Sequence, residues 1–230
     1  MISASSDNTL KVWNLATGEE QFTLNGHSDW VKAVAVTPNG QQVISASSDN
    51  TLKVWNLATG EEQFTLNGHS DWVKAVAVTP NGQQVISASD DNTLKVWNLA
   101  TGEEQFTLNG HSDSVKAVAV TPNGQQVISA SSDNTLKVWN LATGEEQFTL
   151  NGHSDWVKAV AVTPNGQQVI SASDDNTLKV WNFLTGKVIT TFTGEYPINC
   201  CAVAPDGMTI VAGEQSGRVH FLRLEGMREG

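Results

Sequence analysis

Histidine, serine and aspartate stand next to one another in a tripeptide that the chain repeats four times. The copies begin at His27, His69, His111 and His153. These residue types form the triad of serine hydrolases, but a triad is defined by positions in space, and neighbours in a turn do not aim at one another. Acid–base catalysis also needs groups with separated pKa values, whereas identical copies repeat the same group. We therefore predict no catalytic residue and expect that the chain is not an enzyme.

The sequence contains no motif for binding a metal ion or a nucleotide. The four histidines fall in separate copies, and no Cys or His cluster has the spacing of metal ligands. No glycine-rich loop is followed by the lysine of a phosphate-binding motif. Cys200 and Cys201 are adjacent and cannot form a disulfide framework; we expect two small buried thiols in a reducing, cytoplasmic compartment. The sequence predicts no metal and no cofactor.

The tripeptide belongs to a repeat of 42 residues. Five tryptophans keep this spacing, each inside "TLKVWN": Trp13, Trp55, Trp97, Trp139 and Trp181. Between residues 9 and 182 the copies are nearly identical, and beyond Asn182 the last copy keeps the apolar pattern but loses most polar letters. Two columns vary, one holding Trp30, Trp72, Ser114 and Trp156, the other Ser6, Ser48, Asp90, Ser132 and Asp174.

Each copy has the pattern of four short strands, predicted in the second copy at 31–36, 41–47, 51–57 and 61–66. The first strand alternates β-branched residues, and Pro38 and Asn39-Gly40 favour a tight turn after it. Tight turns leave no room for a helix. A repeat of about 40–45 residues with four strands is typical of a propeller blade. We predict an all-β fold, a β-propeller of four-stranded antiparallel blades.

The strand count is 22, which gives five to six blades with incomplete first and last ones. Naming the strands of a blade a to d, residues 1–24 supply b-c-d, residues 25–192 four full blades, and residues 193–230 a divergent a-b-c. We expect one propeller domain, or a fragment of one, over residues 1–230. The strand at 20–24 could complete the last blade, or six blades could remain with gaps, or a second chain could fill them. Unpaired edges invite another strand, so self-association is a further expectation. Met1 cuts a repeat in mid-strand, and we expect an excised or engineered piece of a longer array.

The letters resemble the WD-repeat β-propeller family over nearly the whole chain. Gly68-His69 and Trp97 match its signature, although Asn98 stands where the family has Asp, as in every copy. The resemblance implies a hydrogen-bonded His–Ser–Asp–Trp tetrad in each full blade: His27, Ser45, Asp49 and Trp55; His69, Ser87, Asp91 and Trp97; His111, Ser129, Asp133 and Trp139; and His153, Ser171, Asp175 and Trp181. The first copy has Ser3, Asp7 and Trp13 without a His, and the last has Glu195, Ala212, Ser216 and Leu222, so its tetrad is lost. Near-identical copies also resemble recently amplified bacterial WD-repeat arrays, which implies a sensor or recognition part of a larger protein.

The two variable columns are the candidate binding face. Family members bind partners near the channel entrance, and Trp is enriched at binding hot spots. The candidate residues are Trp30, Trp72, Ser114, Trp156, Ser48, Asp90, Ser132 and Asp174. The alternative is that these tryptophans cover grooves between blades and that Ser114 is neutral drift.

Charge excludes two kinds of partner. The formal net charge of −11 argues against nucleic acid and anionic membranes. No apolar run is long enough to span a bilayer. We expect a scaffold that binds a protein or peptide at the channel entrance. A structural or engineered scaffold without a dedicated ligand is the main alternative, and an enzyme with its site at the channel mouth is the less favoured one.

Overall fold

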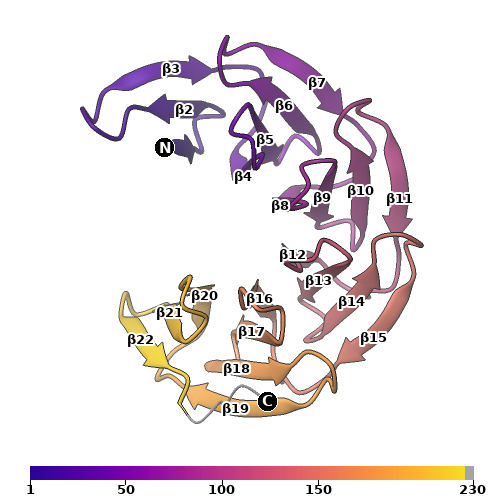
Figure 1. The fold of residues 1–230 in the computed structure, drawn as a ribbon, viewed down its shortest axis with the longest axis vertical. Helices are drawn as coiled ribbons and strands as arrows, with labels where there is room; N and C mark the ends of the chain where they lie inside the picture. The colour runs from indigo at the N-terminus through magenta and orange to yellow at the C-terminus, as the bar shows by residue number, and fades with distance from the viewer. Residues whose placement is uncertain (226–230) are drawn as a thin grey trace. The chain divides into compact units, whose positions relative to one another are not determined.

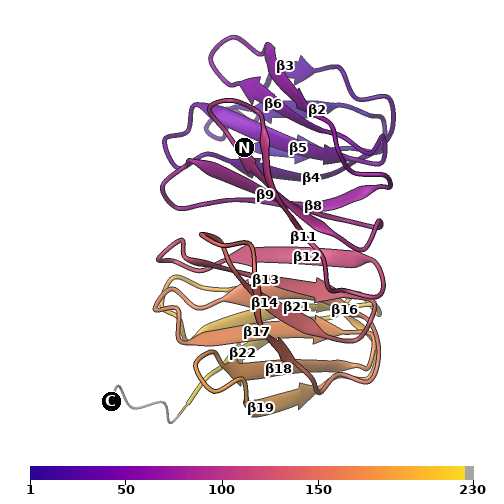
Figure 2. The ribbon, with the colours of Figure 1, turned by 90° about the vertical axis from the view of Figure 1, so that its right-hand side faces the viewer.

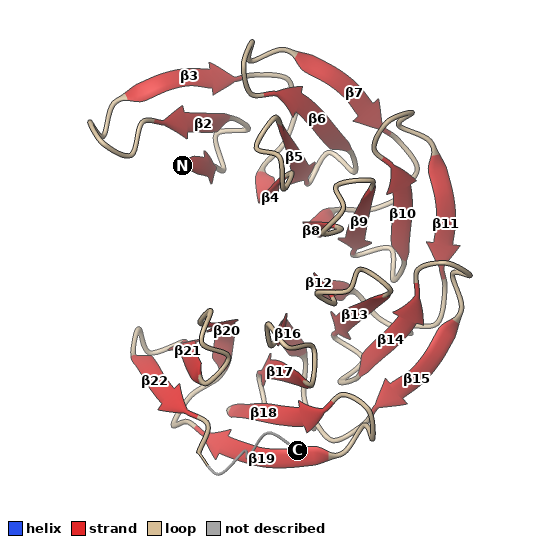
Figure 3. Ribbon diagram, viewed as in Figure 1, coloured by secondary structure: helices blue, strands red, loops and turns tan. Residues whose placement is uncertain are grey.

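The computed structural model describes residues 1–225 and confirms the all-β prediction. These residues form 22 antiparallel strands in sheets of three or four strands, and none of them is helical (Figure 3). Accordingly, the described residues contain no helix that could span a membrane. The chain divides into two compact units, residues 1–115 and 116–230, which are described separately below.

The first unit contains three sheets, which follow the chain order. The three-stranded sheet consists of β1 (Ile2–Ala4), β2 (Leu10–Trp13) and β3 (Glu20–Leu24). Two four-stranded sheets follow: β4 (Val31–Val36), β5 (Gln42–Ser47), β6 (Leu52–Asn56) and β7 (Glu62–Leu66), then β8 (Val73–Val78), β9 (Gln84–Ser89), β10 (Leu94–Asn98) and β11 (Glu104–Leu108).

The second unit begins at the start of β12 and also contains three sheets. The four-stranded ones are β12 (Val115–Val120), β13 (Gln126–Ser131), β14 (Leu136–Asn140) and β15 (Glu146–Leu150), then β16 (Val157–Val162), β17 (Gln168–Ser173), β18 (Thr177–Asn182) and β19 (Val188–Thr193). The last sheet has three strands, β20 (Ile198–Val203), β21 (Thr209–Glu214) and β22 (Val219–Arg223).

Local sequence explains the tight turns between these strands. Gly40 has φ of 69° in the turn after β4, a conformation that costs glycine little. Asn50 has φ of 70° in the turn between β5 and β6, where Asn is tolerated. After β6, the side chain of Asn56 accepts the backbone N–H groups of Ala58 and Thr59 at 2.8 and 3.2 Å. In each unit the turns gather at the two ends of the strands (Figure 2).

Within each unit the sheets bury their faces against one another. In the first unit, Leu10, Val12 and Leu24 pack against Val43 and Trp55 of the next sheet. The same arrangement repeats between the second and third sheets and, in the second unit, between β12–β15 and β16–β19. The first strands of neighbouring sheets, β4 with β8 and β16 with β20, lie side by side (Figure 1). Each sheet is thus stabilised by apolar contact with its neighbour rather than by a core of its own.

Candidate functional site

Three histidines connect three strands or turns of their own sheets through the same hydrogen bonds. In the β4–β7 sheet, His27 Nδ1 lies 2.7 Å from Asp49 Oδ2 and His27 Nε2 lies 2.7 Å from Ser45 Oγ. Trp55 Nε1 donates to the same Ser45 Oγ at 2.9 Å. Matching bonds join His69, Ser87, Asp91 and Trp97 in the next sheet, and His153, Ser171, Asp175 and Trp181 in the second unit.

Protonation of these histidines follows from the network. The carboxylate of Asp49 can only accept, so Nδ1 of His27 carries a proton, and Nε2 accepts the hydroxyl proton of Ser45. Burial lowers the pKa of His27 and that of His153 from the usual 6.5, against the opposing effect of their aspartates. Burial also works against ionisation of Asp175, but hydrogen bonds from Thr177, His153 and Ser154 bring its pKa down to about 2. His27 and His153 are therefore neutral histidines beside ionised aspartates, and the serine hydroxyl is already engaged, which is a poor arrangement for a nucleophile.

Two further copies show the bond between tryptophan and serine. Within the second unit, Trp139 Nε1 donates to Ser129 Oγ at 2.9 Å; Asp133 lies in the same unit and His111 lies in the first. In the first copy Trp13 Nε1 donates to Ser3 Oγ at 2.9 Å.

The last sheet uses a residue that sequence reasoning missed. Glu214 is buried, and its carboxylate accepts the N–H groups of Glu195 and Tyr196 at 2.8 and 3.0 Å. The hydroxyl of Ser216 also donates to it, and this bond, with the two from the backbone, lowers the pKa of Glu214. A carboxylate at the end of the apolar segment 209–214, where the other copies have Ser, was the available signal.

Lysine bridges lie beside Trp13, Trp55, Trp97 and Trp139, and sequence reasoning missed them as well. Lys53 Nζ contacts Glu62 Oε2 and Thr65 Oγ1, both at 2.8 Å. Strict alternation would place Gln63 opposite Trp55, but a register shift between β6 and β7 places Glu62 there instead. Equivalent bridges join Lys95 to Glu104 and Thr107, Lys137 to Glu146 and Thr149, and Lys11 to Glu20.

The glycines before three of the tetrad histidines, Gly26, Gly68 and Gly152, lie tightly against the tetrad tryptophans. A Cβ at Gly68 would lie 3.0 Å from Glu104 Oε2 and 3.1 Å from the Trp97 ring. A Cβ at Gly26 would meet Trp55 at 3.0 Å in the same way. The Gly-His pair therefore permits both the tryptophan and the lysine bridge.

Residues of the two variable columns are hydrogen-bonded to each other in the structure. The backbone N–H of Ser48 donates to the carbonyl oxygen of Trp30 at 2.9 Å, and Asp90 bonds to Trp72 and Asp174 to Trp156 at the same distance. The side chains of Trp30, Trp72 and Trp156 are 49%, 42% and 48% exposed, whereas Trp55 is 1% exposed. These tryptophans are therefore available to a ligand, unlike those of the tetrads.

Lysines of the inner strands lie over these exposed rings. In the first unit, Lys32 Nζ is 4.2 Å from the ring centre of Trp30 and 5.4 Å from that of Trp72. Lys74 Nζ is 5.2 Å from the Trp72 ring and 3.4 Å from Asp90 Oδ2. We call Trp30, Lys32, Ser48, Trp72, Lys74 and Asp90 the tryptophan surface of the first unit.

The second unit repeats part of this arrangement. Lys158 forms an ion pair with Asp174 at 2.7 Å, and Lys116 Nζ lies 5.8 Å from the Trp156 ring. Ser114 and Ser132 are the remaining candidates of the two columns. The N–H of Ser114 is bonded to Asp113, and Ser132 is buried.

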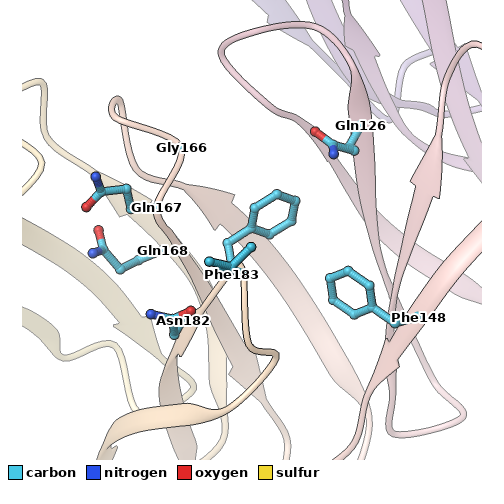
Figure 4. Close-up of a pocket in the computed structure, with 8 residues that line it drawn as sticks. Gln126, Phe148, Gly166, Gln167, Gln168, Asn182 and Phe183 are labelled. Atoms are coloured by element: carbon cyan, nitrogen blue, oxygen red, sulfur yellow. The ribbon is translucent and has the colours of Figure 1, made fainter.

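A groove of about 370 Å³ lies in the second unit (Figure 4). Gly166, which lines it, follows β16, whereas Trp156 precedes β16, so the two lie at opposite ends of that strand. Phe148 of β15 and Phe183 after β18 line it, with their ring centres 6.2 Å apart. Phe183-Leu184 stands where the other copies have Leu-Ala, which was the sequence signal for it.

The cysteines differ from the expectation. Cys200 is exposed, so the expectation that both thiols are buried is wrong. Alternation alone would place Cys200 on the same side as the buried Ile198, but the register of β20 shifts between these two residues, and Cys201 faces the core instead. Burial raises the pKa of Cys201 to about 12, so that thiol is unreactive. Among residues 1–225 no group of His, Cys, Asp and Glu is arranged to hold a metal ion.

Comparison with known proteins agrees with this architecture. The family model described as "IFT122 first beta-propeller" matches residues 75–229, and "WD domain, G-beta repeat" matches residues 18–56. The Lissencephaly-1 homolog of Caenorhabditis briggsae is 41% identical over 44 residues, 19% of this chain and 11% of that protein. Lissencephaly-1 homolog 1 of Paramecium tetraurelia is 39% identical over 44 residues, with the same coverage. The match thus spans about a tenth of the length of these relatives. Because the first family model covers well over half of the residues, the chain belongs to the WD-repeat β-propeller family.

Proposed function

We propose that the chain is a non-catalytic scaffold that binds a protein or peptide through its exposed tryptophans. One observation carries this proposal. Trp30, Trp72 and Trp156 are about half exposed, whereas Trp55, Trp97 and Trp181 of the tetrads are at most 1% exposed, and burying an exposed indole on binding contributes favourably to the binding free energy.

The tetrads support the non-catalytic part of the proposal. Their Ser, His and Asp side chains are already bonded to one another and to the neighbouring tryptophan, so we assign them to holding strands and turns together. We place the chain in a reducing, cytoplasmic compartment, because its two thiols form no disulfide. We assign it to the recognition part of a larger bacterial protein, because its copies are nearly identical.

Self-association is a second candidate, favoured by the edge strand β22. Within the described residues β22 pairs only with β21, and Val219 and Phe221 are 57% and 76% exposed. Such an edge accepts a further strand. Sedimentation of the chain with Val219→Lys and Phe221→Lys checks this, since a smaller assembly is expected and an unchanged mass would contradict it.

Selection of a displayed random peptide library on the chain tests the proposed function. The variant with Trp30, Trp72 and Trp156 replaced by Ser serves as the counter-selection, because Ser114 shows that the repeat accepts Ser there. We expect peptides that bind the wild-type chain and not the variant. Peptides that bind both equally would contradict the proposal, and turnover in a hydrolase or lyase screen would contradict its non-catalytic part.

A further inference from the structure

The tryptophan surface of the first unit holds one lysine with a carboxylate partner and one without. Lys74 pairs with Asp90 at 3.4 Å, and in the second unit Lys158 pairs with Asp174 at 2.7 Å. Lys32 occupies the same place in its copy, but the residue at the position of Asp90 is Ser48. No carboxylate lies within ion-pair distance of Lys32 in the described structure, and its ammonium rests between the Trp30 and Trp72 rings.

The side-chain hydroxyl of Ser48, in the tryptophan surface, has no hydrogen-bond partner. Ser48 is also buried, at 6% exposed. A buried hydroxyl without a partner is costly, and native proteins seldom retain one. A ligand oxygen that reached it would remove that cost.

We propose that Lys32 and Ser48 bind a carboxylate of the ligand, in the place that the side chain of Asp90 fills in the next copy. The ligand is an acidic peptide whose Asp or Glu is flanked by apolar or aromatic side chains that pack on Trp30 and Trp72. This proposal rests on the proposed function, because it names the ligand class of the same surface.

Three features of the surface support this assignment. The Lys74–Asp90 pair shows that a carboxylate fits beside this lysine within the same backbone geometry. Lys32 is partly desolvated between the two rings, and a desolvated ammonium gains more from an anion than a hydrated one. The carboxylates nearby have other partners, because Asp29 accepts the N–H of Trp30 at 2.7 Å and Asp90 pairs with Lys74 at 3.4 Å.

Exchanging residues between copies gives matched variants that keep the repeat's own sequence. Ser48→Asp introduces the residue of the next copy, which neutralises Lys32 and occupies the site. Asp90→Ser does the reverse and frees Lys74. Both residues already occur in this column, so we expect both variants to fold with unchanged circular dichroism.

The experiment measures binding of the selected library peptides that the triple tryptophan variant loses. We expect these peptides to contain Asp or Glu beside an apolar residue, and replacing that residue by Gln or Asn to weaken binding at least tenfold. Ser48→Asp should also weaken it at least tenfold, and Asp90→Ser should tighten it at least twofold.

The experiment distinguishes failure of the carboxylate site from failure of the proposed function. Peptides that need the tryptophans but bind Ser48→Asp and the Gln or Asn peptides as tightly as the originals would overturn the carboxylate site and leave the proposed function intact. A selection in which no peptide distinguishes the wild-type chain from the triple tryptophan variant would overturn both.

Discussion

The backbone N–H of Ser48 donates to the carbonyl oxygen of Trp30 at 2.9 Å, although 17 residues separate them in the sequence. These are the two positions at which otherwise identical copies differ. A single hydrogen bond therefore joins the residues that distinguish one copy from the next, which is the arrangement expected of a surface that diverges for recognition while its scaffold is retained.

The His69 tetrad should contribute measurably to stability. His69→Ala leaves Asp91 and Ser87 without their partner, and loss of a partner at buried polar groups costs about 1–3 kcal/mol. The melting temperature should fall by about 2–4 °C per kcal/mol, measured by calorimetry. Ser70→Ala, at an exposed neighbouring position, is the control. A His69→Ala protein that melts with the control would contradict a structural role.

Acid should destabilise the chain in two stages. The lowered pKa values of His27 and His153 mean that unfolding takes up protons below pH 6.5, so this stabilisation is complete above that pH and is lost as the pH falls. Asp175, lowered from 3.8 to about 2, contributes stability above pH 4 that disappears between about pH 4 and 2. Urea unfolding from pH 8 to 2 should show both decreases. Stability that rises from pH 7 to 5 would contradict neutral buried histidines.

Lys95 and Lys179 form a matched pair for the lysine bridge. Lys95 contacts Glu104 at 2.8 Å with side chains 10% and 32% exposed, whereas Val188 stands where Glu104 would be beside Lys179. Lys95→Met should cost about 1–2 kcal/mol after allowance for the partial exposure of Glu104, and Lys179→Met should cost less. Equal losses in chemical denaturation would show that the bridge contributes nothing.

Restoring the missing carboxylate should stabilise the second unit. Val188 is 41% exposed and lies opposite Trp181, as Glu104 lies opposite Trp97. Val188→Glu should pair with Lys179 and raise the free energy of unfolding by about 0.5–1 kcal/mol. Val188→Gln is the control without charge. A Glu variant that is no more stable than the Gln variant would rule out the bridge at this position.

The fold could be predicted from the sequence because each copy carries its own turn and strand signals. Pro38 and Gly40 mark the turn, and alternation marks the strands, so the predicted count of 22 strands is confirmed and the strand ends predicted for the second copy differ from the structure by at most one residue. Glu62 could not be placed beside Lys53, because the register shift that turns it there is not visible in an alternating pattern.

The site was only partly predictable for a similar reason. Repetition identified the variable columns, and comparing copies pointed to Trp30 and Ser48. Comparison could not show that Ser48 Oγ has no partner or that Lys32 lies between two rings, since both depend on packing between neighbouring sheets. In the divergent last copy, comparison with the other copies marks Glu214 only as a carboxylate in place of Ser, and its hydrogen bonds are seen only in the structure.

The most direct test of this account is the melting temperature of the chain with Trp30, Trp72 and Trp156 replaced together by Ser, compared with that of Trp55→Ser. If the exposed tryptophans serve recognition, the triple variant should melt within about 6 °C of the wild-type chain, because surface substitutions usually change stability by no more than about 0.5 kcal/mol each and 1 kcal/mol corresponds to about 2–4 °C. Trp55→Ser, which removes a buried side chain, should lose about 3–5 kcal/mol. A triple variant that unfolds as readily as Trp55→Ser would show that these tryptophans hold the sheets together and would contradict the account.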